Sequence, residues 1–152
     1  MPVKERIGNT CIFTIVSRNY LHYARTLLAS IKEHYPDADL VVGLCDRKGD
    51  IDFSDEVFDI IELEELAIPE REKFIFRYTI LEINTAIKPY IIGQLFDAGY
   101  KKVIYFDPDI CVYNSLTEMV SLLDPHQMLL TPHLSNLLDD GKLPDELAIL
   151  TS

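Results

Sequence analysis

The chain has 152 residues, which is enough for one globular domain. Hydrophobic residues make up 48% of it and charged residues 26%, values ordinary for a soluble globular protein. Its 25 acidic and 14 basic side chains give a net charge of −11. A surface that negative repels phosphate backbones and anionic membranes, which argues against nucleic-acid binding as the main function. The net charge does not exclude binding of one phosphorylated small molecule, because the charge at a local site can differ from the average charge of the surface.

The cysteines and the N-terminus bear on the compartment. Cys11, Cys45 and Cys111 are far apart and each lies in an apolar run, which favours buried free thiols in a reducing environment. The first residues contain no apolar core of a signal peptide, and no apolar stretch is long enough to span a membrane. We therefore expect a cytoplasmic protein without a membrane span.

The first 45 residues predict a strand, a helix and a second strand. Residues 11–16 form a nearly continuous apolar run rich in β-branched and aromatic side chains, typical of a strand buried on both faces. From Tyr20 to Ile31 apolar residues recur every three or four positions, which indicates an amphipathic helix. Pro36 ends that helix, and residues 40–45 form a second apolar run. This order predicts a βαβ unit.

The middle of the chain is less regular. Residues 46–55 are polar and predict a loop, and residues 57–63 alternate weakly and suggest a third strand. Residues 62–73 predict a short helical turn and a loop. Residues 74–95 show a long helical pattern that Pro89 interrupts, so this helix is either kinked or built from two pieces.

Residues 103–106 predict a further buried strand, which residues 110–113 continue beyond Asp107-Pro108-Asp109. The resulting alternation of strands and helices predicts an α/β fold, with a mostly parallel sheet flanked by helices. We expect the strands at residues 11–16, 40–45 and 103–106 to be adjacent in one sheet.

The last part of the chain predicts small elements. Ser115 and Glu118 have the spacing of a capping box, which predicts a helix that runs through Leu123. Residues 127–130 predict a short strand. Three later leucines fall at helical spacing close to the end of the chain, and their apolar face predicts self-association or poor order of this segment. These leucines are Leu143, Leu147 and Leu150.

Asp107-Pro108-Asp109 is the sharpest chemical feature of the sequence. Two carboxylates follow a buried strand at positions i and i+2, and in an extended backbone such residues point the same way. Pro108 restricts its own φ and biases Asp107 toward an extended conformation. Mn²⁺ and Mg²⁺ prefer such oxygen ligands and share them with substrate phosphates. The alternative is a polar turn that interrupts the strand.

Other candidate residues stand at the ends of predicted strands or on the long helix. The turn after the first strand holds no glycine-rich phosphate motif, but Ser17 and Asn19 can hydrogen-bond a base or cap the helix, and Tyr20 can stack on a ring or pack. Asp46 is a second sheet-edge carboxylate or the start of an Asx turn. Lys88 can contact a phosphate or extend into solvent.

Together these features resemble nucleotide-sugar-dependent glycosyltransferases of the GT-A type, close to the family-8-like bacterial enzymes. The likeness covers about residues 11–150 and depends on the spacing from a lysine-bearing helix through a strand into D-x-D. The residues that carry it are the strand at 11–16 with Ser17-Arg18-Asn19-Tyr20, Asn84-Thr85-Ala86-Ile87-Lys88-Pro89, and Lys102-Val103-Ile104-Tyr105-Phe106-Asp107-Pro108-Asp109-Ile110.

The resemblance implies roles for particular residues. Asp107 and Asp109 would hold Mn²⁺ or Mg²⁺ on the diphosphate of a nucleoside-diphosphate sugar, and Lys88 would approach that donor. Asn19 and Tyr20 would contact the base and the ribose. Ser17 stands where related sequences often carry an acidic residue that recognises uracil. The identity of the base is therefore not predicted.

The resemblance also implies sugar transfer to an unknown acceptor, with the metal as a Lewis acid. Because GT-A catalytic domains of this kind are usually longer, we expect residues 1–152 to be one GT-A-like domain or its donor-binding part, with weak activity or none. Two alternatives are a non-catalytic nucleotide-sugar-binding module and a nucleotidyltransferase. The sugar-activating nucleotidyltransferases usually carry a glycine-rich basic loop after the first strand, which this sequence lacks.

Overall fold

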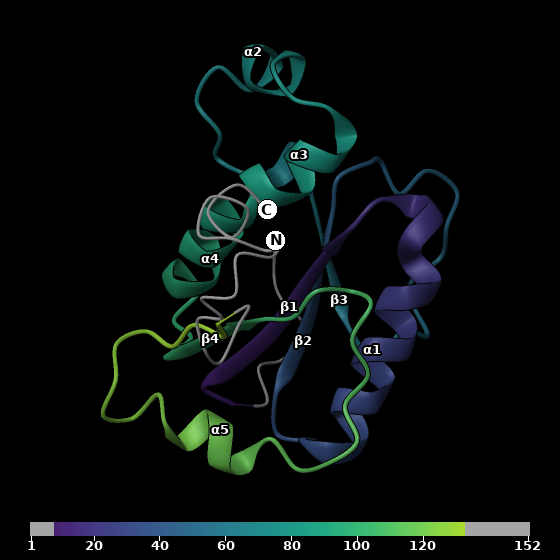
Figure 1. The fold of residues 1–152 in the computed structure, drawn as a ribbon. Coiled ribbons are helices and arrows are strands. Elements are labelled where there is room, and N and C mark those ends of the chain that lie inside the picture. Colours follow the sequence, from purple (N-terminus) through teal and green to yellow (C-terminus); the bar gives the residue numbers. More distant parts are fainter. Residues whose placement is uncertain (1–7, 133–152) are drawn as a thin grey trace, which may run out of the picture. The chain divides into compact units, whose positions relative to one another are not determined.

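The computed structural model describes residues 8–132 (Figure 1). The chain divides into two compact units, residues 1–120 and residues 121–152. The first unit contains the sheet and the helices that cover it. The helical spacing predicted for Leu143, Leu147 and Leu150 lies outside the described residues.

The core of the first unit is a four-stranded, all-parallel sheet, which confirms the predicted α/β fold. Its strands are β1 (Thr10–Val16), β2 (Asp39–Leu44), β3 (Asp59–Glu62) and β4 (Lys102–Tyr105), in the order β3-β2-β1-β4. The three strands that we expected to be adjacent are neighbours, since β1 pairs with β2 on one side and with β4 on the other. β3 confirms the third strand suggested by the weak alternation.

One face of the sheet packs against α1 (Leu21–His34). Ile12 and Val16 of β1 point to this face because alternate strand residues face opposite sides. They meet the buried stripe of α1, which includes Leu27, Leu28 and Ile31 at the predicted helical spacing. This packing explains why a strand at the centre of the sheet is apolar at nearly every position.

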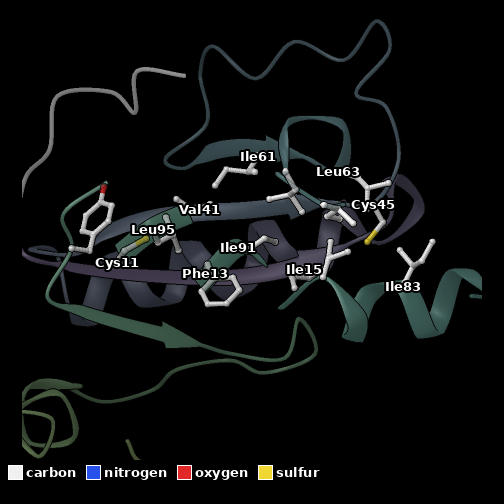
Figure 2. Packing of buried hydrophobic residues seen from close by; sticks show 14 residues of the cluster. Cys11, Phe13, Ile15, Val41, Cys45, Ile61, Leu63, Ile83, Ile91 and Leu95 are labelled. Atoms are coloured by element: carbon white, nitrogen blue, oxygen red, sulfur yellow. The ribbon is translucent and has the colours of Figure 1, made fainter. Parts of the chain in front are cut away.

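The other face packs against α3 (Ile80–Ala86) and α4 (Lys88–Asp97). Figure 2 shows Phe13 and Ile15 of β1 among Ile91, Leu95 and neighbouring side chains. The sheet is therefore the middle layer between α1 and the pair of helices α3 and α4.

The predicted interruption of the helical pattern at Pro89 is confirmed, and residues 74–95 contain a second break that was not predicted. α2 (Arg71–Phe76) ends before Thr79, which begins α3 with a capping box that it shares with Glu82. α3 ends at Ala86, and α4 begins at Lys88 with Pro89 in its first turn, where the missing N–H of proline costs little. The 3-10 turn η2 (Leu63–Glu65) confirms the short helical turn expected before them.

The expectation that residues 110–113 continue the strand is wrong. After β4 the chain turns at residues 107–110 and leaves the sheet, and the backbone N–H of Val112 donates to Ser30 Oγ of α1 at 3.0 Å. Val112 is buried in the cluster that contains α1. Packing against this helix accounts for Val112 alone, since Ile110 and Tyr113 are exposed.

The predictions for residues 115–130 need two corrections. α5 (Thr117–Ser121) is shorter than the predicted helix, and Ser115 Oγ accepts a hydrogen bond from the N–H of Thr117 at 3.2 Å. Residues 127–130 do not form a strand: none of the four strands of the described residues includes them. Met128 and Leu130 are exposed, so this apolar run also lacks the burial of a sheet strand.

Within the described part of the chain, every helix is too short or too polar to cross a lipid bilayer.

Candidate functional site

The candidate residues lie where the parallel strands end. The carboxyl ends of parallel strands meet at one edge of a sheet, and open α/β sheets bind ligands there. β4 stays paired with β1 up to the bond from Phe106 N–H to the carbonyl oxygen of Phe13, at 3.0 Å. Asp107 is the next residue, so it begins the loop that leaves this edge.

Asp107-Pro108-Asp109 is a turn, which corrects the extended geometry we predicted. The N–H of Ile110 donates to the carbonyl oxygen of Asp107 at 3.3 Å and closes a four-residue turn. Proline is favoured at the second position of such turns and aspartate at the first. The alternation of an extended strand therefore does not apply to Asp107 and Asp109. The turn starts at Asp107, and the exposed Asp109 lies two residues further along it.

Asp107 Oδ1 contacts two side chains of other elements. The hydroxyl of Tyr105 donates a hydrogen bond to it at 2.8 Å, and Lys88 Nζ of α4 lies 4.0 Å from it. Lys88 Nζ also lies 4.1 Å from the centre of the Tyr105 ring, within range of a cation–π interaction. These three side chains, Lys88, Tyr105 and Asp107, form a cluster that we call the edge triad.

Sequence reasoning missed Tyr105, because it is part of an apolar run and looked like an ordinary core residue. Its ring does pack on Phe13, with 5.2 Å between ring centres. Burial raises the pKa of the Tyr105 hydroxyl well above its usual range, and the hydrogen bond to Asp107 raises this pKa further. Tyr105 therefore stays protonated and donates to the carboxylate. The sequence feature that could have identified Tyr105 as a site residue is its position at the end of a strand, two residues before Asp107.

Lys88 stands at the first position of α4, and no acidic side chain occupies that first turn. Ile87, in the right-handed helical conformation, is both the last cap of α3 and the first cap of α4, so Lys88 also lies just beyond the end of α3, where a cation is favourable. The two helix ends therefore have opposite effects on its charge. The Lys88 side chain is only 29% exposed, so it does not extend freely into solvent, and its contact with a phosphate stays a prediction.

A hydrogen bond between two side chains joins the end of β2 to α3 beside this edge. The thiol of Cys45, just after β2, lies 2.7 Å from Asn84 Oδ1 of α3 and donates to it. Burial, with a smaller effect from the charge of Asp46, raises the pKa of Cys45 to about 12. Cys45 is therefore a neutral structural thiol at neutral pH.

The turn after β1 forms a separate group at the same edge. The N–H of Arg18 donates to Asp46 Oδ2 at 2.8 Å, so Asp46 holds this turn instead of forming an Asx turn with its own loop. Ser17 is buried and makes no side-chain cap bond. Asn19 and Tyr20 are exposed, and the Tyr20 ring stacks on Tyr23 at 5.5 Å.

The structure thus brings together some of the predicted residues and not others. Lys88 and Asp107 are in contact, and Asp46 contacts the turn that contains Ser17, Asn19 and Tyr20. Across residues 8–132, no hydrogen bond or ion pair joins this turn to Asp107 or Asp109.

The donor set fits a hard divalent ion only in part. Carboxylate oxygens of Asp107 and Asp109 are the ligands that Mg²⁺ and Mn²⁺ prefer. Among the described residues, however, no group of three or more His, Cys, Asp or Glu side chains is placed to hold a metal. An ion at this turn would need further oxygens from water or a phosphorylated ligand, which is the usual arrangement for Mg²⁺ in proteins.

Comparison with known proteins adds no assignment: no protein-family model matches the chain, and no curated protein matches it either.

Proposed function

We propose that this chain binds a nucleoside-diphosphate sugar through a divalent ion at Asp107 and Asp109, and acts in transfer of the sugar to an acceptor. The observation that carries the proposal is the edge triad, which sets a carboxylate and a lysine side by side at the carboxyl edge of a parallel sheet. Divalent ions and lysine or arginine side chains commonly bind phosphates, and this pair offers a carboxylate for the ion and an ammonium for the phosphates.

The residues have distinct roles in this proposal. Asp107 and Asp109 would hold Mn²⁺ or Mg²⁺, and a bound ion would neutralise negative charge on the departing nucleoside diphosphate. Lys88 supplies a positive charge to the phosphates. The exposed ring of Tyr20 and the amide of Asn19 are available to a base and a ribose, and Asp46 holds the turn that carries them. The base, the sugar and the acceptor stay open.

The test is a turnover assay with a panel of nucleoside-diphosphate sugars in the presence of Mn²⁺. We expect slow release of nucleoside diphosphate that is lost in Asp107→Asn and in Asp109→Asn. Asp55→Asn is the matched control, because it removes the same charge from an exposed loop residue. Equal turnover in all four proteins would contradict the proposal, and binding of the donor without turnover would favour the non-catalytic module.

A further inference from the structure

The edge triad contains its own cation. Lys88 Nζ and the Tyr105 hydroxyl both approach the same oxygen, Asp107 Oδ1, at 4.0 Å and 2.8 Å. The ammonium also lies over the Tyr105 ring, so it is held from two directions. The carboxylate of Asp107 therefore has a lysine of a different element as its neighbour.

Lys88 lies between two helix ends. It is the first residue of α4, and the residue before it, Ile87, caps both the end of α3 and the start of α4. The start of a helix disfavours a cation and the end of a helix favours one, so these two effects oppose each other. The contacts that orient the ammonium are therefore those with Asp107 and Tyr105, and loss of the carboxylate contact would leave the ammonium to approach another anion.

A divalent ion and an ammonium repel each other and draw on the same carboxylate charge. We propose, on the basis of the proposed function, that Lys88 is an internal competitor of the divalent ion at Asp107. It neutralises the carboxylate when no ligand is present, and when an ion and a diphosphate bind together it exchanges the carboxylate for a phosphate oxygen. The site is then selective for the metal and the diphosphate together, and weak for the metal alone.

This proposal predicts two effects of opposite sign for Lys88→Met, which removes the charge and keeps a similar apolar stem. The affinity for Mn²⁺ alone is expected to rise about two- to fivefold, the size of one exposed ion pair. The affinity for a nucleoside diphosphate in the presence of Mn²⁺ is expected to fall by at least a similar factor. A lysine that only binds phosphate would produce the second effect without the first, and a lysine in solvent would produce neither.

The affinity for Mn²⁺ alone is measured by water-proton relaxation, which detects weak binding. The affinities for uridine diphosphate and guanosine diphosphate are measured by calorimetry at a fixed Mn²⁺ concentration. Both nucleotides are used because the base is not assigned. Lys101→Met is the matched control, since it removes one exposed positive charge at the opposite end of β4. Lys88→Arg keeps the charge and is expected to bind Mn²⁺ within about twofold of the wild type.

The outcomes separate this inference from the proposed function. Mn²⁺ binding that is lost in Asp107→Asn but is unchanged or weaker in Lys88→Met overturns the competitor role and leaves the metal site intact. Tighter Mn²⁺ binding with unchanged nucleotide affinity overturns the exchange of Lys88 onto a phosphate. Absence of any Mn²⁺ or nucleotide binding that depends on Asp107 overturns both proposals. If Lys88→Met does not fold, the comparison is made with Lys88→Gln, for which the same two signs are expected.

Discussion

The thiol of Cys45 donates a hydrogen bond to the amide oxygen of Asn84 at 2.7 Å, across 39 positions of sequence. This contact joins the carboxyl end of β2 to α3, directly before the helix that carries Lys88. It therefore ties the central sheet to the elements that shape the candidate site. Because the thiol is buried, its protonation is linked to stability.

The first prediction concerns alkaline pH. Burial raises the pKa of Cys45 from 9.0 to about 12, so above pH 9 the unfolded chain loses this proton more readily than the folded one. The free energy of unfolding should therefore fall as the pH rises from about 9 toward about 12. The check is urea unfolding of the wild type and Cys45→Ala at several pH values above neutrality. The wild type should lose stability more steeply than the variant, and parallel curves would refute the linkage.

The second prediction concerns the close contact of α4 with the sheet at Gly43 of β2. A Cβ atom at Gly43 would collide with Cδ1 of Ile91 and would lie 3.2 Å from Cγ1 of Ile15. Overpacking of this kind typically costs about 1–3 kcal/mol, so Gly43→Ala should lower the free energy of unfolding by about that amount.

Gly93 in the same helix is the control, because nothing lies within 4 Å of its Cβ position. Gly93→Ala is expected to raise the free energy of unfolding by about 0.4–1 kcal/mol, since alanine favours the helix. Urea unfolding measures both variants. A result in which Gly43→Ala is as stable as the wild type would contradict this prediction and would mean that the Ile91 side chain or α4 shifts at little cost.

The third prediction concerns the turn after β1. Asp46→Ala removes the acceptor of the Arg18 N–H, and the exposed hydrogen bond should be worth about 0.5–1.5 kcal/mol of stability. Asp46→Asn keeps an acceptor oxygen at the same distance and should lose less. Amide hydrogen exchange at Arg18 reports on this bond directly: the exchange rate should increase in Asp46→Ala. An unchanged rate would mean that Asp46 does not hold the turn.

The sequence predicted those parts of the structure that depend on local periodicity. The buried runs of β1 and β2 and the three-to-four spacing of α1 reflect side chains that point into one core, and the structure has each where it was expected. The break before α3 also had a signal, the capping box of Thr79 and Glu82, which the long helical pattern concealed.

The site was less predictable, because its contacts depend on how distant elements pack. Lys88 contacts Asp107 because α4 packs against the sheet through Ile91 and Leu95. The distance between two such elements cannot be predicted from the local sequence of either one. Tyr105 has an apolar ring in the core and a hydroxyl on a carboxylate, so its residue type alone favoured neither role. At Asp107 and Asp109, the turn at Pro108 replaced the extended geometry that the preceding strand had suggested.

The central claim is that Asp107 and Asp109 form a divalent-metal site for a nucleoside diphosphate. Calorimetry of a nucleoside diphosphate in the presence of Mn²⁺ tests it most directly, on the native protein, on Asp107→Asn/Asp109→Asn and on Asp55→Asn. The account predicts metal-dependent binding by the native protein and by Asp55→Asn, and a loss of at least about tenfold in affinity in the double variant, since two charged ligands are removed. Equal binding by the double variant and the native protein would contradict it.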